Sequence, residues 1–236
     1  MPASDHTGSL PRRSFMGRLA AGLLAFGGAF AGAADDVAAQ PVASGPWAPT
    51  RHPQDDWLDA LPGQHRLFFD ATSPAGVGDA ITYASNFYVA SKSGYALADA
   101  ENTVIIGLRH HATAFAFGDA IWAKYGAPLA ERIRFNDPRN SAPPVINVYQ
   151  TTGYGTLLTN REVTLAAMIG RGTHFAVCDM ATRAFAGVVA GKLSLKSAEV
   201  YEEMKASAVQ NSHFVPAGIV AVNRAQERGY AIQHIG

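Results

Sequence analysis

The sequence predicts an α/β protein with a doubly wound, flavodoxin-like, mostly parallel sheet and helices on both faces. Two observations predict this fold. In the C-terminal part of the 236-residue chain, short apolar segments of strand length alternate with longer segments of helical periodicity. One of the apolar segments, Thr103–Leu108, is β-branched, continuous and uncharged, as expected of a central strand in a parallel sheet.

The first half of the domain predicts two strands and two helices. The first strand is bounded by polar residues, and the helices are expected to end at Gly94 and Gly126, because glycine is favoured just after a helix. We expect strands over Leu67–Phe69 and Thr103–Leu108, and helices over Val77–Ser91 and Thr113–Tyr125.

Residues 127–160 break the alternation. They are rich in proline and glycine, and Val145–Tyr149 is the one short segment there that suits a strand. A long irregular insert in a compact α/β domain is usually a binding loop or an oligomer contact.

The second half of the domain returns to alternating elements. Pro216 is expected to open the last helix and Gly229 to follow its end. We expect helices over Arg161–Arg171, Asp179–Val189, Ala198–Val209 and Pro216–Arg228, and strands over Thr173–Cys178 and Tyr230–Ile235.

The N-terminus predicts export. Arg12 and Arg13 precede Leu19–Ala34, an apolar run rich in alanine and glycine, and this arrangement is typical of a twin-arginine signal. The run is short of the roughly 20 residues that a membrane span needs, so we expect cleavage, a periplasmic location and no stable membrane span afterwards. Residues 1–39 are therefore assigned to the signal and its cleavage region.

The rest of the chain is expected to form an arm and one domain. Residues 40–64 lack sustained apolar periodicity and predict a linker that hugs the surface through Trp47 and Trp57. Residues 65–236 predict a single α/β domain. The formal net charge is +0, which argues against a nucleic-acid partner, and the single cysteine excludes an intramolecular disulfide and a zinc site built on several thiolates.

Reactive side chains of a doubly wound sheet lie at the carboxyl ends of its strands. Three polar clusters occupy such positions, and we expect them to face one crevice. They are Asp70, Arg109-His110-His111 and Cys178-Asp179.

Cys178 is the candidate catalytic residue. Amide N–H groups at a helix N-terminus favour a thiolate and lower the pKa of a cysteine. The neighbouring carboxylate of Asp179 opposes this unless it caps the helix, while Arg183 adds positive charge. The alternative is a buried, inert cysteine at the end of an apolar strand.

The two histidines of the second cluster are ligand-binding candidates together with Asp70, Arg109, Asp179 and Arg183. Histidine is the commonest metal ligand, but adjacent side chains are expected to point in different directions, so no metal or other cofactor is predicted. The alternatives are a helix cap made by His111 and a solvent-facing His110. His174 is expected to be a hydrogen-bonded core or interface residue.

Much of residues 65–236 resembles the DsrE/DsrF-like family of small sulfur-relay proteins, and in particular an exported, twin-arginine branch of it. The stretches that carry the resemblance are HRLFFDATSPAGVGDAITYASNFY, TVIIGLRHHATAFAFGDAIWAKYG, THFAVCDMATRAFAG and VPAGIVAVNRAQERGYAIQHIG. The resemblance implies a flavodoxin-like fold, a homo-oligomer, and a strand-end cysteine that carries sulfur as a persulfide, a position that Cys178 matches. This chain departs from the relay members in being exported and in lacking a second thiol.

Three functions follow as hypotheses. The first is a periplasmic persulfide carrier that uses Cys178 and exchanges sulfur with a thiol-bearing protein or a small sulfur species. The second is a non-catalytic, oligomeric ligand- or metal-binding module built on Arg109, His110, His111 and the insert. The third is an oligomeric scaffold in which Cys178 is part of the core. The sequence leaves open whether the protein turns over a substrate.

Overall fold

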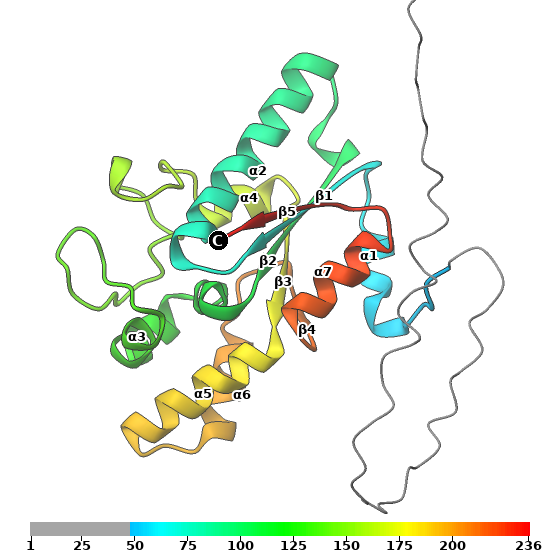
Figure 1. The fold of residues 1–236 in the computed structure, drawn as a ribbon. Helices are drawn as coiled ribbons and strands as arrows, with labels where there is room; N and C mark the ends of the chain where they lie inside the picture. The colour runs from blue at the N-terminus through cyan, green and yellow to red at the C-terminus, as the bar shows by residue number, and fades with distance from the viewer. Residues whose placement is uncertain (1–47) are drawn as a thin grey trace, which may run out of the picture. The chain divides into compact units, whose positions relative to one another are not determined.

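A computed structural model describes residues 48–236; the predicted export signal and Trp47 lie outside this part of the chain. It contains a five-stranded, entirely parallel sheet in the order β4-β3-β2-β1-β5 (Figure 1). The strands are β1 (His65–Ala71), β2 (Asn102–Leu108), β3 (His174–Cys178), β4 (Ser212–Val215) and β5 (Ala231–Ile235). The predicted doubly wound α/β fold is confirmed.

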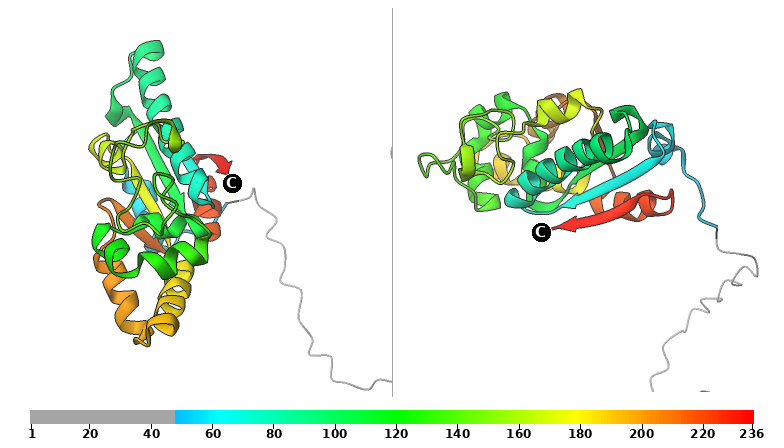
Figure 2. Two further views of the ribbon diagram at one scale, coloured as in Figure 1. Left: turned by 90° about the vertical axis from the view of Figure 1, so that its left-hand side faces the viewer. Right: turned by 90° about the horizontal axis from the view of Figure 1, so that it is seen from above.

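Helices cover both faces of the sheet. One face carries α2 (Pro74–Tyr95), α3 (Asp119–Ile133), α4 (Leu165–Gly170), α5 (Asp179–Leu193) and α6 (Ser197–Ala206). The other carries α1 (Asp56–Ala60) and α7 (Gly218–Gln226), and α7 contacts all five strands. Figure 2 shows α2 and α7 on opposite sides of β1. Short 3-10 helices lie at η1 (Pro53–Asp55), η2 (Asp99–Glu101), η3 (His110–Ala116) and η4 (Gly155–Leu157).

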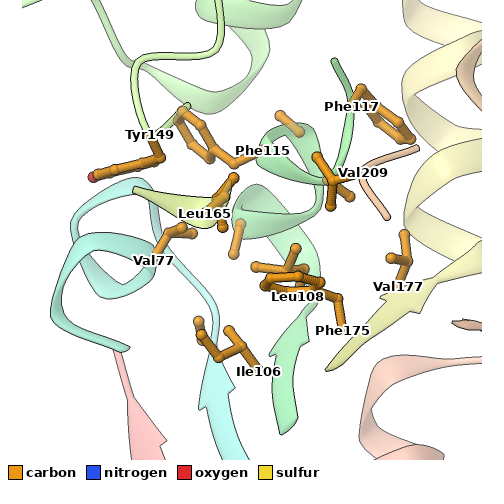
Figure 3. Packing of buried hydrophobic residues seen from close by; sticks show 14 of the residues in the cluster. Val77, Ile106, Leu108, Phe115, Phe117, Tyr149, Leu165, Phe175, Val177 and Val209 are labelled. Atoms are coloured by element: carbon orange, nitrogen blue, oxygen red, sulfur yellow. The ribbon is translucent and has the colours of Figure 1, made fainter. Parts of the chain in front are cut away.

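Alternation along the strands divides the buried side chains into two cores. Phe69, Ile106 and Phe175 point to the face with the larger core, part of which is shown in Figure 3. Phe68 and Ile105 point to the smaller core beneath α7. Every residue of β2 is buried, which explains why this strand carries the clearest sequence signal.

The connections change direction after β4. From β1 to β4 the chain steps one strand at a time in one direction, and α7 then crosses the other face to bring β5 beside β1. The segment after β3 therefore leaves on one face and the segment after β4 on the other. Ligands of open α/β sheets bind at such a switch point, outside the carboxyl ends of the strands.

The predicted second helix is wrong at both of its ends. Residues 110–116 form η3, and α3 continues through Gly126 until Arg134, which adopts a left-handed conformation. Gly126 lies in the middle of α3 because a Cβ there would clash with the carbonyl oxygen of Pro144. The glycine at position 126 is therefore needed for the close approach of the chain at Pro144, and it does not mark the end of the helix. The irregular insert correspondingly begins only after residue 134.

Other predicted elements differ in type or extent. Val145–Tyr149 is not a strand: the amide of Asn147 donates to the carbonyls of Phe115 and Phe117 at 2.8 and 2.9 Å, which fixes an irregular turn. Pro216 lies outside α7, which begins at Gly218. The helix predicted over 161–171 is limited to α4.

The segment that precedes β1 is packed on the sheet. The Trp57 ring stacks on His213 of β4 with ring centroids 4.0 Å apart, and Leu58 is buried in the smaller core. The expected anchoring by Trp57 is confirmed. None of the helices among residues 48–236 is both long and apolar enough to cross a membrane.

Candidate functional site

Four polar residues from four strand ends lie on the α7 side of the sheet. Asp70 follows Phe68 by two positions and Cys178 follows Ala176 by two, so both side chains point to the face of the smaller core. His234 is paired in register with Asp70, and Arg109 directly follows β2. The structure therefore brings Asp70 together with Arg109 of the second cluster, and Cys178 lies on the same face of the sheet.

Asp70 is the centre of this arrangement. Arg109 donates to both carboxylate oxygens of Asp70, from Nε at 2.6 Å and from Nη2 at 2.8 Å, and His234 Nδ1 lies 2.9 Å from Oδ2. Burial alone would raise the pKa of Asp70, but the hydrogen bonds and charges of Arg109 and His234 hold that pKa below its usual value. The carboxylate is thus kept ionised and fixes the plane of the guanidinium.

Cys178 lies at the switch point between β3 and β4. It is the N-cap residue of α5, its backbone is extended, and its carbonyl accepts a hydrogen bond from Thr182 at 3.0 Å. The residue is buried, with an exposed fraction of 7%. The sole thiol of the chain therefore stands where a sheet of this type opens to a ligand.

Arg109 links the Asp70 cluster to the thiol. The hydrogen bond to Asp70 raises the pKa of Arg109. Leu108 is in register with Val177, so Arg109 and Cys178 follow at neighbouring positions of adjacent strand ends. Gly218, the first residue of α7, packs on the Arg109 side chain so closely that a Cβ there would clash with it. Arg109 is consequently held from two sides.

Asp179 and Arg183 form a separate pair with Tyr201. Arg183 Nε donates to Asp179 at 2.7 Å, Tyr201 donates to the other carboxylate oxygen at 2.5 Å, and Arg183 Nη2 donates to the Tyr201 hydroxyl at 2.9 Å. Asp179 therefore does not cap α5, and that alternative is wrong. Because its charge is compensated by Arg183, Asp179 opposes a thiolate at Cys178 less than an unpaired carboxylate would.

His110 and His111 lie together, contrary to expectation. Their rings stack with centroids 4.0 Å apart and planes 13° apart. The physical reason is the left-handed backbone of His110, with φ of 54°, which turns its side chain beside that of His111. Burial lowers the pKa of His111, and the charges of His110, Arg132 and Arg134 lower it further. His111 makes no capping bond to η3.

No metal site emerges from the described residues. Residues 48–236 contain no group of three or more histidine, cysteine, aspartate or glutamate side chains arranged to hold an ion. His174 is half-buried, and its Nδ1 lies 3.0 Å from Nε2 of His213, which confirms the expected hydrogen-bonded role.

Three residues of these clusters were not predicted from the sequence: His234, Tyr201 and Gly218. His234 does carry a sequence signal, because it stands near the end of a predicted strand and the strand-end rule applies to it. Tyr201 and Gly218 carry none, since each acts through a contact between elements far apart in the chain.

The chain matches no model of a known protein family, no curated protein and no solved structure. Its chemistry therefore has to follow from the site itself. The arrangement offers a single thiol at a helix N-terminus, a fixed guanidinium beside it and no redox partner thiol in the chain. Such a set is suited to holding a negatively charged group on sulfur.

Proposed function

We propose that this protein is an exported persulfide carrier in which Cys178 holds the sulfur. The observation that carries the proposal is the position of Cys178, at the switch point, on the N-terminus of the 15-residue helix α5 and next to Arg109 at the ends of adjacent strands. The resemblance to the DsrE/DsrF-like family supports the carrier role, and the twin-arginine pattern supports the export.

The transfer needs only one thiol. The Cys178 thiolate attacks the sulfane sulfur of a donor persulfide, the donor S–S bond breaks, and the donor leaves as a thiolate. The products are the Cys178 persulfide and the donor thiol, with no net oxidation or reduction. A partner thiolate reverses the same step, so the lack of a second cysteine is no obstacle.

Arg109 has a defined role in this scheme. A persulfide places its charged terminal sulfur about 2 Å beyond Sγ. The guanidinium, fixed by Asp70, stabilises this anion by a charge-assisted interaction. Arg109 thus acts as a positioning residue for the bound sulfur.

The direct test is intact mass spectrometry of the purified protein after incubation with polysulfide and removal of excess reagent, without reductant. We expect the wild-type chain to gain mass in whole sulfur atoms and the Cys178→Ser variant to gain none. Arg109→Gln should lower the modified fraction by roughly threefold to tenfold, because one charge-assisted contact is lost.

One control variant and one contradicting outcome make the result decisive. Arg132→Gln removes an exposed arginine elsewhere, on α3, and should leave the modified fraction unchanged. An unmodified wild-type mass, together with inertness of Cys178 to a small alkylating reagent in the folded protein, would refute the carrier and leave the scaffold hypothesis.

The second candidate is a non-catalytic ligand-binding module, favoured by one observation. His111 Nε2 is buried and has no hydrogen-bond partner among the described residues, next to the stacked His110. A ligand acceptor there would satisfy it. This candidate predicts that Cys178→Ser still binds the ligand, whereas the carrier predicts loss of all sulfur loading.

A further inference from the structure

A polar cavity lies between α2 and the loop of residues 155–162, and Cys178 is not among the residues that line it. Its volume is about 580 Å³, within the usual range for small-molecule sites. Asp79, Thr82 and Tyr83 line it from the helix, and Leu158 and Arg161 line it from the loop. Residues 155–160 of the loop belong to the predicted insert of residues 127–160, and residues 161 and 162 directly follow it.

The loop is held against α2 by specific contacts. Thr82 donates its hydroxyl to the carbonyl of Thr159 at 2.7 Å, and the hydroxyl of Thr159 donates to the carbonyl of Ala75 at 3.1 Å. Gly78 permits this approach, because a Cβ there would clash with the Thr159 side chain. The cavity is therefore bounded by walls that the fold itself fixes.

The loop wall contains unusual backbone. Arg161 and Glu162 are consecutive non-glycine residues in the left-handed region, with φ of 48° and 69°. The Glu162 carboxylate accepts the backbone N–H groups of Gly153 and Gly155, which keeps this conformation in place. Strained backbone of this kind persists where surrounding contacts impose it, and it clusters at ligand sites.

The cavity is also lined by two side chains of opposite charge that form no ion pair or hydrogen bond within the described residues. Asp79 stands on the helix wall and Arg161 on the loop wall, and neither side chain has an ion-pair or hydrogen-bond partner within residues 48–236. Tyr83 adds a half-exposed aromatic ring, whereas Leu158 is buried and contributes little surface. Arg161 is exposed and Asp79 is half-buried, so both are accessible to a ligand, and a ligand that carries an ammonium and a carboxylate group would pair with both.

We propose that this cavity binds a small zwitterion, either a free α-amino acid or a short peptide, with its carboxylate on Arg161 and its ammonium group on Asp79. The aromatic ring of Tyr83 favours a ligand with an apolar side chain. The site is independent of the proposed sulfur chemistry, so the Cys178→Ser variant binds the zwitterion as the wild type does.

The test is isothermal titration calorimetry with three probes: L-phenylalanine, the tripeptide alanyl-phenylalanyl-alanine, and N-acetyl-phenylalanine amide, which has the same side chain and no charges. We expect one of the two zwitterions to bind with a Kd below about 1 mM and the blocked compound not to bind. Which zwitterion binds distinguishes a free amino acid from a peptide. Absence of binding by both, or equal binding of the blocked compound, would overturn the proposal.

The variants separate binding from folding. Asp79→Asn and Arg161→Gly should each weaken binding by about tenfold or more, since each removes one charge partner. Arg161→Gly also relieves the left-handed backbone, so its Tm should not fall. Arg134→Gly is the matched control, because it relieves an exposed arginine at φ of 55° outside the cavity and should leave the affinity unchanged. Unchanged affinity in both cavity variants would contradict the assignment.

Discussion

Asp70 is the residue on which the strand-end arrangement depends. Its side chain is 5% exposed and forms hydrogen bonds with an arginine and a titratable histidine from neighbouring strand ends, Arg109 and His234. We expect Asp70→Asn to destabilise the protein by about 2–4 kcal/mol at pH 7, because it leaves the guanidinium without its charged partner. Glu199→Gln, which removes an exposed carboxylate paired with an exposed lysine, is the control and should cost less than about 1 kcal/mol.

The same residue gives a pH dependence with a definite sign. The pKa of Asp70 is lowered in the folded state, so its contribution to stability is complete above the unfolded pKa of about 4 and is lost as the pH falls through the folded value. The difference in urea midpoint between the wild type and Asp70→Asn should therefore shrink below about pH 4. A difference that stays constant down to pH 2 would contradict the ionised pair.

Much of the candidate site was predictable at this scale, and the exceptions have physical reasons. Asp70, Arg109 and Cys178 are predictable because each stands at the carboxyl end of a buried strand. The partners of Asp179 were not, since Tyr201 reaches it from α6 across 22 positions of sequence. The stacking of His110 on His111 depends on the left-handed φ angle of His110, which the pattern of side chains in the sequence does not predict.

At the scale of elements, two glycines in helices have opposite consequences. Gly126 of α3 faces the Pro144 backbone, whereas Gly191 of α5 has no atom within 4 Å of the position that an alanine methyl group would take. Gly126→Ala should destabilise the protein by about 1–3 kcal/mol because the chain at Pro144 must shift. Gly191→Ala should stabilise it by roughly 0.5–1 kcal/mol through helix propensity. Thermal unfolding of the two variants tests both predictions. If both substitutions stabilised the protein, the backbone at Pro144 would be able to move away from position 126 at little cost.

This pair also shows which elements the sequence can predict. β1, β2 and β3 are predictable because each contains a continuous apolar segment, and β5 is predictable because it follows the glycine after the last predicted helix, although it is an edge strand that mixes polar and apolar residues. β4 was missed, since Ser212–Val215 is a short edge strand that mixes polar and apolar residues. The end of α3 was misplaced because a glycine required by packing is indistinguishable in sequence from one that ends a helix.

At the scale of the whole molecule, α1 and the edge of the sheet are joined through two neutral histidines. Trp57 stacks on His213, and His213 lies 3.0 Å from His174, so the segment before β1 contacts β4 at the far side of the sheet from β5. Burial lowers the pKa of His213 to about 4, and the charge of His174 adds to the effect; burial also lowers the pKa of His174. Both rings are therefore held uncharged at neutral pH.

Acid should loosen this junction before the carboxylates titrate. As the pH falls below the unfolded histidine pKa of about 6.5, these histidines bind protons in the unfolded chain but not in the folded state. The free energy of unfolding therefore declines between about pH 6.5 and pH 4. We expect the loss to be of the order of 1–2 kcal/mol, because solvent screens these half-buried rings. The His213→Gln variant should be less stable at pH 7 through loss of the Trp57 stack, yet should lose less additional stability at pH 5 than the wild type. Urea unfolding at the two pH values measures both effects, and an equal decline in the two proteins would mean that other groups set the acid sensitivity of the fold.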